Sequence, residues 1–157
     1  MIKNPRLLIV CIAVPLLVGA LASFLTRDSM AAFAALEKPP LSPPGILFPI
    51  VWTVLYILMG AASYLVLTSG ARQEDIDHAI TAYGLQLAMN FLWSIIFFRL
   101  EWYLAAFIWL VLLWIAILYT LLVFRRISKP AGWLLMPYLL WVTFAGYLNL
   151  SIYLLNR

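Results

Sequence analysis

Apolar residues fill five long stretches of this chain, and short polar or proline-rich segments separate them. A helix rises about 1.5 Å per residue, so about 20 apolar residues cross a hydrocarbon core of about 30 Å. No soluble domain of this length has enough interior to hide so much apolar surface. The pattern predicts an all-α membrane protein, with residues 1–157 forming a single bundle of five transmembrane helices. The helices are expected at about 6–26, 45–68, 78–98, 103–124 and 131–155.

The connections between these helices differ in character. Residues 27–44 predict a long loop whose proline-dense end is stiff and non-helical, because proline lacks an amide donor and fixes φ. Residues 69–77 predict a short polar loop, and residues 125–130 a basic turn. Six lysines and arginines fall at one set of helix ends and four at the other. This bias favours a cytoplasmic N terminus and an external proline-rich loop.

Composition removes several classes of function. The chain is 66% hydrophobic and 10% charged with a net charge of +4, and no basic face interleaved with aromatics predicts nucleic-acid binding. With one cysteine and one histidine, Cys11 and His78, the chain predicts no metal site. The predicted spans hold no acid, and neither paired carboxylates nor a nucleophile triad can be assembled. We therefore predict no catalytic residue.

The third predicted helix carries polar residues on one face. Gln86, Asn90, Trp93 and Phe97 follow i, i+4, i+7 and i+11. Amides inside hydrocarbon are costly unless they meet a partner or face a cavity. Two interpretations stay open at this point: hydrogen bonds between helices, or a ligand pocket.

The fifth predicted helix has a comparable stripe. Pro137, Trp141, Ala145 and Asn149 share one face, and a small residue one turn after a tryptophan leaves a gap. In the second predicted helix, Trp52, Tyr56 and Ser63 also lie on one side. Three helices thus each present tryptophan with a polar or small residue. A pocket of this kind suits a large, flat, apolar molecule.

Two weaker patterns bear on partners. Gly84 and Ala88 form a small-xxx-small pair that is typical of a helix contact or a dimer face. Leu150, Tyr153 and Arg157 fit a loose pattern proposed for cholesterol contact, and an interfacial tyrosine and arginine are the alternative interpretation.

Three segments carry a resemblance to a known family. They are residues 36–44 followed by 51–56, residues 86–98, and residues 136–149. In their order and spacing the chain resembles the tryptophan-rich sensory protein and translocator protein family, also known as peripheral-type benzodiazepine receptors. The resemblance covers nearly the whole chain.

This resemblance implies a five-helix bundle, often a homodimer, with a pocket closed by the loop between the first two long helices. Relatives bind porphyrins such as protoporphyrin IX and haem, sterols in some lineages, and benzodiazepine-type drugs; no further cofactor is implied. The matching positions would place Trp52, Asn90, Trp141 and Ala145 in the pocket. The other site residues expected are Gln86, Trp93, Tyr56 and, on the loop, Phe33.

At two loop positions the chain departs from its relatives. Ala32 and Leu41 stand where relatives often carry tryptophan, which weakens the loop as an aromatic clamp. The first functional hypothesis is a receptor or carrier for tetrapyrroles in the bilayer of a bacterial cell. The alternatives are an enzyme-like protein that breaks down porphyrin in light, and a membrane scaffold that binds no small ligand.

Overall fold

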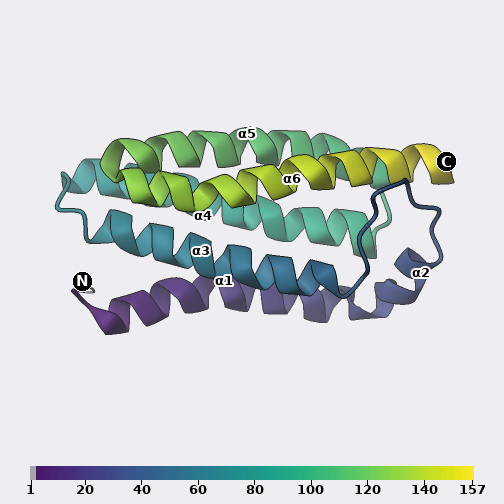
Figure 1. The fold of residues 1–157 in the computed structure, drawn as a ribbon, viewed down its shortest axis with the longest axis horizontal. Helices are drawn as coiled ribbons and strands as arrows, with labels where there is room; N and C mark the ends of the chain where they lie inside the picture. The colour runs from purple at the N-terminus through teal and green to yellow at the C-terminus, as the bar shows by residue number, and fades with distance from the viewer. Residues whose placement is uncertain (1–2) are drawn as a thin grey trace.

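Five long helices run side by side and alternate in direction along the molecule (Figure 1). The computed structural model describes residues 3–157, and within that range it contains helices and loops but no strand. The long helices are α1 (Pro5–Thr26), α3 (Leu47–Leu67), α4 (Gln73–Ser94), α5 (Tyr103–Ile127) and α6 (Lys129–Asn156). The prediction of an all-α bundle is confirmed.

Three short helical segments complete the chain. A 3₁₀-turn, η1 (Arg27–Ser29), and a five-residue helix, α2 (Met30–Ala34), continue from the end of α1. A π-helix, η2 (Ile95–Arg99), extends α4. Residues 27–46, which join α1 to α3, are called the lid loop below, and in Figure 1 they cross the end of the bundle where α6 also ends.

Two predicted boundaries were wrong. Residues 27–44 are not all loop, because the alanine-rich run in α2 forms a short helix. The helix α4 begins at Gln73 rather than near residue 78, and Glu74 and Asp75 occupy its first turn. Acidic side chains there favour a helix start through the positive end of the helix dipole. Hydropathy marks the part of a helix that lies in hydrocarbon and misses such a polar first turn.

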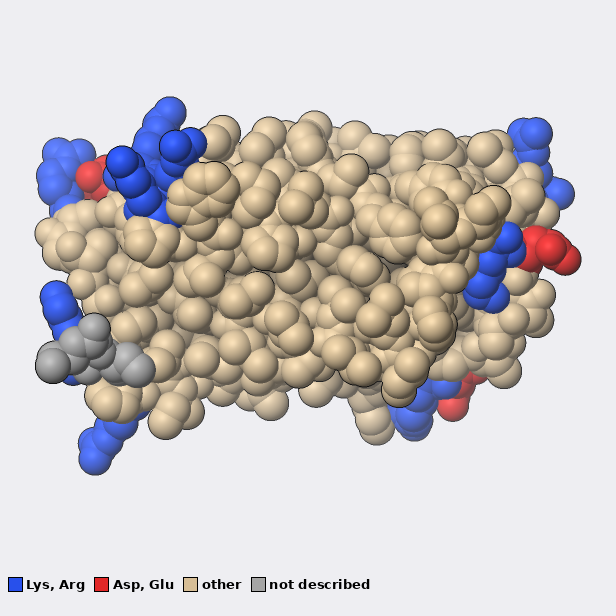
Figure 2. Space-filling model, viewed as in Figure 1, with Lys and Arg blue, Asp and Glu red and all other residues tan. Residues whose placement is uncertain are grey.

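Within the described residues, five segments are long and apolar enough to cross a membrane. They are Pro5–Ala34, Leu47–Leu67, Gln73–Arg99, Tyr103–Ile127 and Lys129–Asn156. Figure 2 shows lysines, arginines and acids gathered at the two ends of the bundle, with an uncharged belt between them. This distribution fits a protein whose middle lies in hydrocarbon and whose ends reach the headgroups. The predicted five transmembrane helices are confirmed.

The helices pack in a ring. The most extensive contacts are α5 with α6 and α1 with α3, followed by α4 with α5 and α3 with α6, while α1 touches α4 and η2 over a shorter length. Buried side chains such as Phe124, Leu135 and Tyr138 fill the space between α3, α4, α5 and α6. By contrast, α1 buries only Cys11, Pro15, Ala22 and Thr26. The core is thus off-centre, and α1 joins the bundle chiefly through α3.

Two glycines explain how closely α1 and α3 approach. A Cβ on Gly60 would lie 2.5 Å from the Cα of Ile12 and 2.6 Å from the carbonyl oxygen of Cys11. A Cβ on Gly19 would overlap the ring of Tyr56. Because small residues let helix backbones come together in a membrane, these positions fix the α1–α3 contact.

Candidate ligand-binding site

A cavity of about 390 Å³ lies near the lid-loop end of the bundle. Its volume falls in the range of small-molecule sites. The walls come from α1, the lid loop, α3, the end of α4 with η2, and α6. The lining residues are Gly19, Ala22, Ser23, Thr26, Arg27, Met30, Phe33, Phe48, Pro49, Trp52, Tyr56, Trp93, Ser94, Phe97, Phe98, Trp141, Ala145, Leu148, Asn149 and Ile152.

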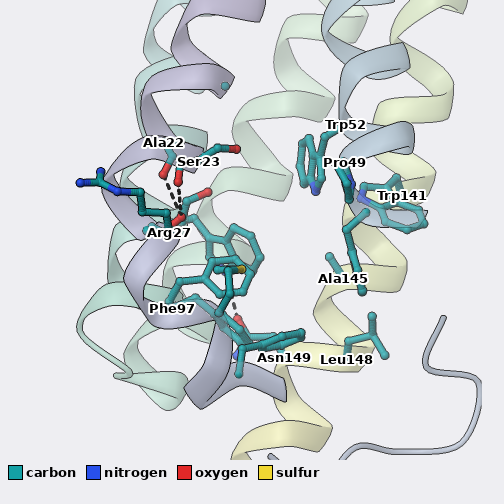
Figure 3. A pocket seen from close by; sticks show the side chains of 18 of the residues that line it. Ala22, Ser23, Arg27, Pro49, Trp52, Phe97, Trp141, Ala145, Leu148 and Asn149 are labelled. Carbon is teal, nitrogen blue, oxygen red and sulfur yellow. Dashed lines mark hydrogen bonds between the residues drawn. The ribbon is translucent and has the colours of Figure 1, made fainter. Parts of the chain in front are cut away.

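One face of α6 forms a wall of this cavity. Trp141, Ala145 and Asn149 line it in successive turns, as their spacing predicts. Figure 3 shows Trp52 of α3 on the same side as Trp141, with Ala145 below them and Ala22 and Ser23 of α1 across the cavity. The small side chain of Ala145 leaves open space between Trp141 and Asn149, which lie one turn away on either side.

The opposite wall owes its shape to the π-helix. In η2 the amide of Leu100 donates to the carbonyl of Ile95 at 3.0 Å, one residue further back than in an α-helix. Phe97 and Phe98 both line the cavity, although they are adjacent in sequence. Single π-turns in helices are frequent at functional sites, so this one supports the assignment of the cavity as a site.

An aromatic cluster closes the end of the cavity beneath the lid loop. The ring of Phe33 lies 6.3 Å from that of Phe48, 6.0 Å from Phe97 and 5.3 Å from Phe98. These separations are typical of edge-to-face aromatic contacts. Phe33 lines the cavity, and its contact with a ligand stays a prediction.

Two side chains of α6 hold the lid loop in place. The amide side chain of Asn156 accepts from the Glu37 backbone N–H at 3.0 Å and donates to the Glu37 carbonyl at 2.9 Å. The hydroxyl of Tyr147 donates to the Pro40 carbonyl at 2.8 Å. Within the loop, Lys38 Nζ donates to three carbonyls, including that of Phe33 at 3.0 Å, and so caps the end of α2. The loop is therefore held as a cover at this end of the bundle, and its residues Arg27, Met30 and Phe33 line the cavity.

The positions expected to carry tryptophan in relatives do not contribute to this cover. Leu41 is 81% exposed and adopts a positive φ of 72°, and Ala32 is exposed as well. Neither lines the cavity.

Some polar side chains of the wall are hydrogen bonded within the protein. Trp93 Nε1 donates to Asn149 Oδ1 at 3.0 Å, and Asn149 Nδ2 donates to the Tyr103 carbonyl at 2.9 Å. The indole N–H of Trp141 is buried and, within the described residues, makes no hydrogen bond. It is an unused donor in the cavity wall. Arg27 contributes little charge to the interior, since its guanidinium points away from the cavity in Figure 3 and lies over the ring of Phe24.

Gln86 and Asn90 lie behind the wall. Asn90 Nδ2 donates to the Tyr138 hydroxyl at 2.7 Å, and that hydroxyl donates to Gln86 Oε1 at 2.7 Å. Both amides are 1% exposed, and neither lines the cavity. The geometry matches the first of the two interpretations, hydrogen bonds between helices. A direct ligand contact for this pair stays a prediction.

Sequence reasoning missed Tyr138, which links α6 to α4 and packs edge-on against Trp52 with ring centres 6.2 Å apart. It also missed Phe48, Phe98 and the α1 residues of the cavity. Gly19 and Ala22 are small residues three positions apart on one face of α1, and this spacing was a usable signal for the α1 wall. Of the residues in the sterol-type pattern, Leu150 lies in a separate groove on the outer face, described below, and Tyr153 and Arg157 line neither site.

Comparisons with known proteins agree with this architecture. Residues 11–155 match the model of the TspO/MBR family. The chain is 43% identical to the tryptophan-rich protein TspO of Chlorobaculum tepidum, over 98% of each chain. It is 36% identical to the tryptophan-rich sensory protein of Cereibacter sphaeroides, over 77% of this chain and 74% of that one. It is 35% identical to the translocator protein of Ovis aries, over 85% and 80%.

The family match and the five spans together settle class and location. The protein is a multi-pass integral membrane protein of a bacterial cell membrane. The three segments that suggested the resemblance all lie inside the matched range. The chain belongs to the TspO/MBR family of membrane proteins.

Proposed function

We propose that the protein binds a porphyrin, such as protoporphyrin IX or haem, in the cavity and acts as a membrane receptor or carrier in tetrapyrrole regulation or transport. The observation that carries the proposal is the unpaired indole N–H of Trp141 in a wall rich in aromatic side chains. A buried donor without a partner costs about 1–3 kcal/mol, which a ligand acceptor at that point would offset. A porphyrin offers a flat apolar ring with polar edge groups.

The shape of the cavity supports the same ligand class. The indoles of Trp52 and Trp141 and the gap at Ala145 form one side, and the rings of Phe97 and Phe98 form another. Aromatic walls with few polar groups favour a large, flat molecule over a compact polar one. Among the relatives, the names of the Cereibacter sphaeroides and Ovis aries proteins refer to sensing and translocation, which fits a receptor or carrier.

The test is an absorbance titration of the detergent-purified protein with protoporphyrin IX in the dark. Trp141→Phe removes the donor and is expected to weaken binding about tenfold, the net worth of one hydrogen bond. Ala145→Phe fills the gap and should weaken it further. Trp133→Phe is the matched control, because Trp133 is 61% exposed and lies outside the cavity. Unchanged affinity in both cavity variants would refute the assignment.

We also propose that the protein forms a homodimer through α4. Gly84 and Ala88 are exposed, and a Cβ on Gly84 would meet no atom within 4 Å, so this outward face can admit a second helix. In a chemical cross-linking experiment, Gly84→Leu should lower the yield of dimer, while Leu85→Ala at the next position should not. Equal dimer yields in both variants would place the contact elsewhere.

A further inference from the structure

A second hollow lies on the outside of the bundle, in the groove between α5 and α6. Its volume is about 370 Å³, and it shares no residue with the inner cavity. We call it the outer groove. It is lined by Phe107, Leu110, Val111, Trp114, Val142, Thr143, Gly146, Tyr147 and Leu150.

The outer groove offers an occupant almost no free polar group. Trp114 Nε1 donates to Thr143 Oγ1 at 2.8 Å, and that hydroxyl donates to the Leu139 carbonyl at 2.9 Å. The Tyr147 hydroxyl is engaged with the Pro40 carbonyl. An occupant therefore needs no hydrogen-bonding group of its own, which excludes polar small molecules and favours plain hydrocarbon.

The groove opens toward the bilayer. Val111 and Tyr147 in its wall are 44% and 41% exposed, and Ile108 and Ile115 beside it are each 55% exposed. All of these residues lie within membrane-spanning segments. Gly146 contributes no side chain, and a Cβ there would meet only Leu110 Cδ2, at 3.6 Å. We propose that the outer groove binds one acyl chain of a membrane phospholipid.

Tyr147 connects this lipid site to the lid loop. Its ring forms part of the groove wall, and its hydroxyl holds the Pro40 carbonyl. A chain packed against the ring keeps the side chain in the orientation that reaches Pro40, so an occupied groove favours the closed lid loop. A lid loop held closed in this way slows exchange of the cavity ligand. This last consequence rests on the function proposed above, whereas the lipid site does not.

Photolabelling tests the lipid site. The protein is placed in nanodiscs of phosphatidylcholine that carries a diazirine in one acyl chain, irradiated, and digested for mass spectrometry. Peptides of the groove should carry more label than those around Ile57 and Leu92, which are also lipid-facing. Gly146→Leu fills the groove and should remove the excess label. Leu140→Phe adds bulk at a 62% exposed position of the same helix outside the groove and should leave it unchanged.

Hydrogen exchange tests the coupling. Exchange of the lid-loop amides is compared in nanodiscs of straight-chain and methyl-branched diphytanoyl phosphatidylcholine. The branched chains pack poorly in the groove. In wild-type protein the lid-loop amides should therefore exchange about threefold faster, because the hydrogen bond from Tyr147 to Pro40 is partly lost. Tyr147→Phe keeps the ring and loses the hydroxyl; its lid loop should exchange quickly in both lipids. Its groove should still be labelled as in the wild type.

The outcomes separate the claims. Uniform labelling that Gly146→Leu does not alter would overturn the lipid site, and cross-links between two α5–α6 faces would assign the groove to a second copy instead. Labelling as expected with no effect of lipid on the lid loop would overturn the coupling. Neither experiment contains porphyrin, so a failed porphyrin titration would refute only the proposed function.

Discussion

The indole of Trp93 and the side-chain amide of Asn149 are hydrogen bonded at 3.0 Å across the cavity wall, and this pair ties three helices together. Trp93 belongs to α4 and Asn149 to α6, and the second donor of the amide reaches the Tyr103 carbonyl at the start of α5. Both side chains are buried. One amide thus sets the position of an aromatic wall residue and the junction of η2 with α5.

Asn149→Leu should destabilise the fold. It leaves the buried Trp93 N–H unpaired and removes the bond from the Asn149 amide to the Tyr103 carbonyl, at a cost of about 1–3 kcal/mol. Unfolding in SDS, followed by circular dichroism, measures the change. Leu154→Ala is the control, because Leu154 is 47% exposed on the same helix. If both variants unfold at the wild-type midpoint, the hydrogen bond between Trp93 and Asn149 does not contribute to stability.

Gly19→Val should force α1 away from Tyr56. A Cβ at this position already overlaps the Tyr56 ring, and such overpacking costs roughly 1–3 kcal/mol. Replacing the ring as well, in Gly19→Val with Tyr56→Ala, should recover part of the loss. A double-mutant cycle on unfolding midpoints gives the coupling energy. Additive effects would contradict a direct contact between the two positions.

Tyr138→Phe separates support from ligand contact. It removes the hydroxyl between Gln86 and Asn90, and hydrogen bonds between membrane helices are worth about 0.6 kcal/mol on average and up to about 1.7. We expect a loss of stability in that range and a nearly unchanged porphyrin affinity, since the hydroxyl does not line the cavity. Tyr153→Phe is the control, because Tyr153 lies on the same helix and lines neither the cavity nor the outer groove. A strong loss of affinity without loss of stability would put the network in direct contact with ligand.

Phe33→Ala should loosen the lid loop. It deletes the ring that contacts Phe48, Phe97 and Phe98, and aromatic pairs are worth about 0.5–1.5 kcal/mol each. Release of bound porphyrin, followed by stopped-flow fluorescence with an excess of apomyoglobin as acceptor, should quicken about tenfold or more. Leu41→Ala, at an exposed position of the same loop, should release at the wild-type rate. Identical rates in all three proteins would exclude the loop from control of release.

Helical periodicity predicted much of this site. Trp141, Ala145 and Asn149 lie where a 3.6-residue repeat puts them, and hydropathy located all five spans. Such signals are local, and they suffice where a straight helix presents one face to the bundle.

The parts that escaped prediction depend on contacts distant in sequence or on irregular backbone. Phe98 lines the cavity from within the π-helix, where the backbone departs from the regular repeat that spacing rules assume. Tyr138 gains its role from Gln86 and Asn90, 52 and 48 residues away. Gly19 matters because one ring of α3 lies against it. Each of these requires the relative placement of two helices, which the sequence pattern does not contain.

The uneven packing of the ring has a mechanical meaning. The glycine contacts join α1 and α3 into one rigid arm, and α4, α5 and α6 form the other. The cavity lies where these arms meet: Trp52 of one arm and Trp141 of the other lie side by side in one wall, and Phe97 belongs to another. The seam where α3 meets α6 therefore runs through one wall of the cavity, and a change in the packing of these two helices would change the shape of that wall.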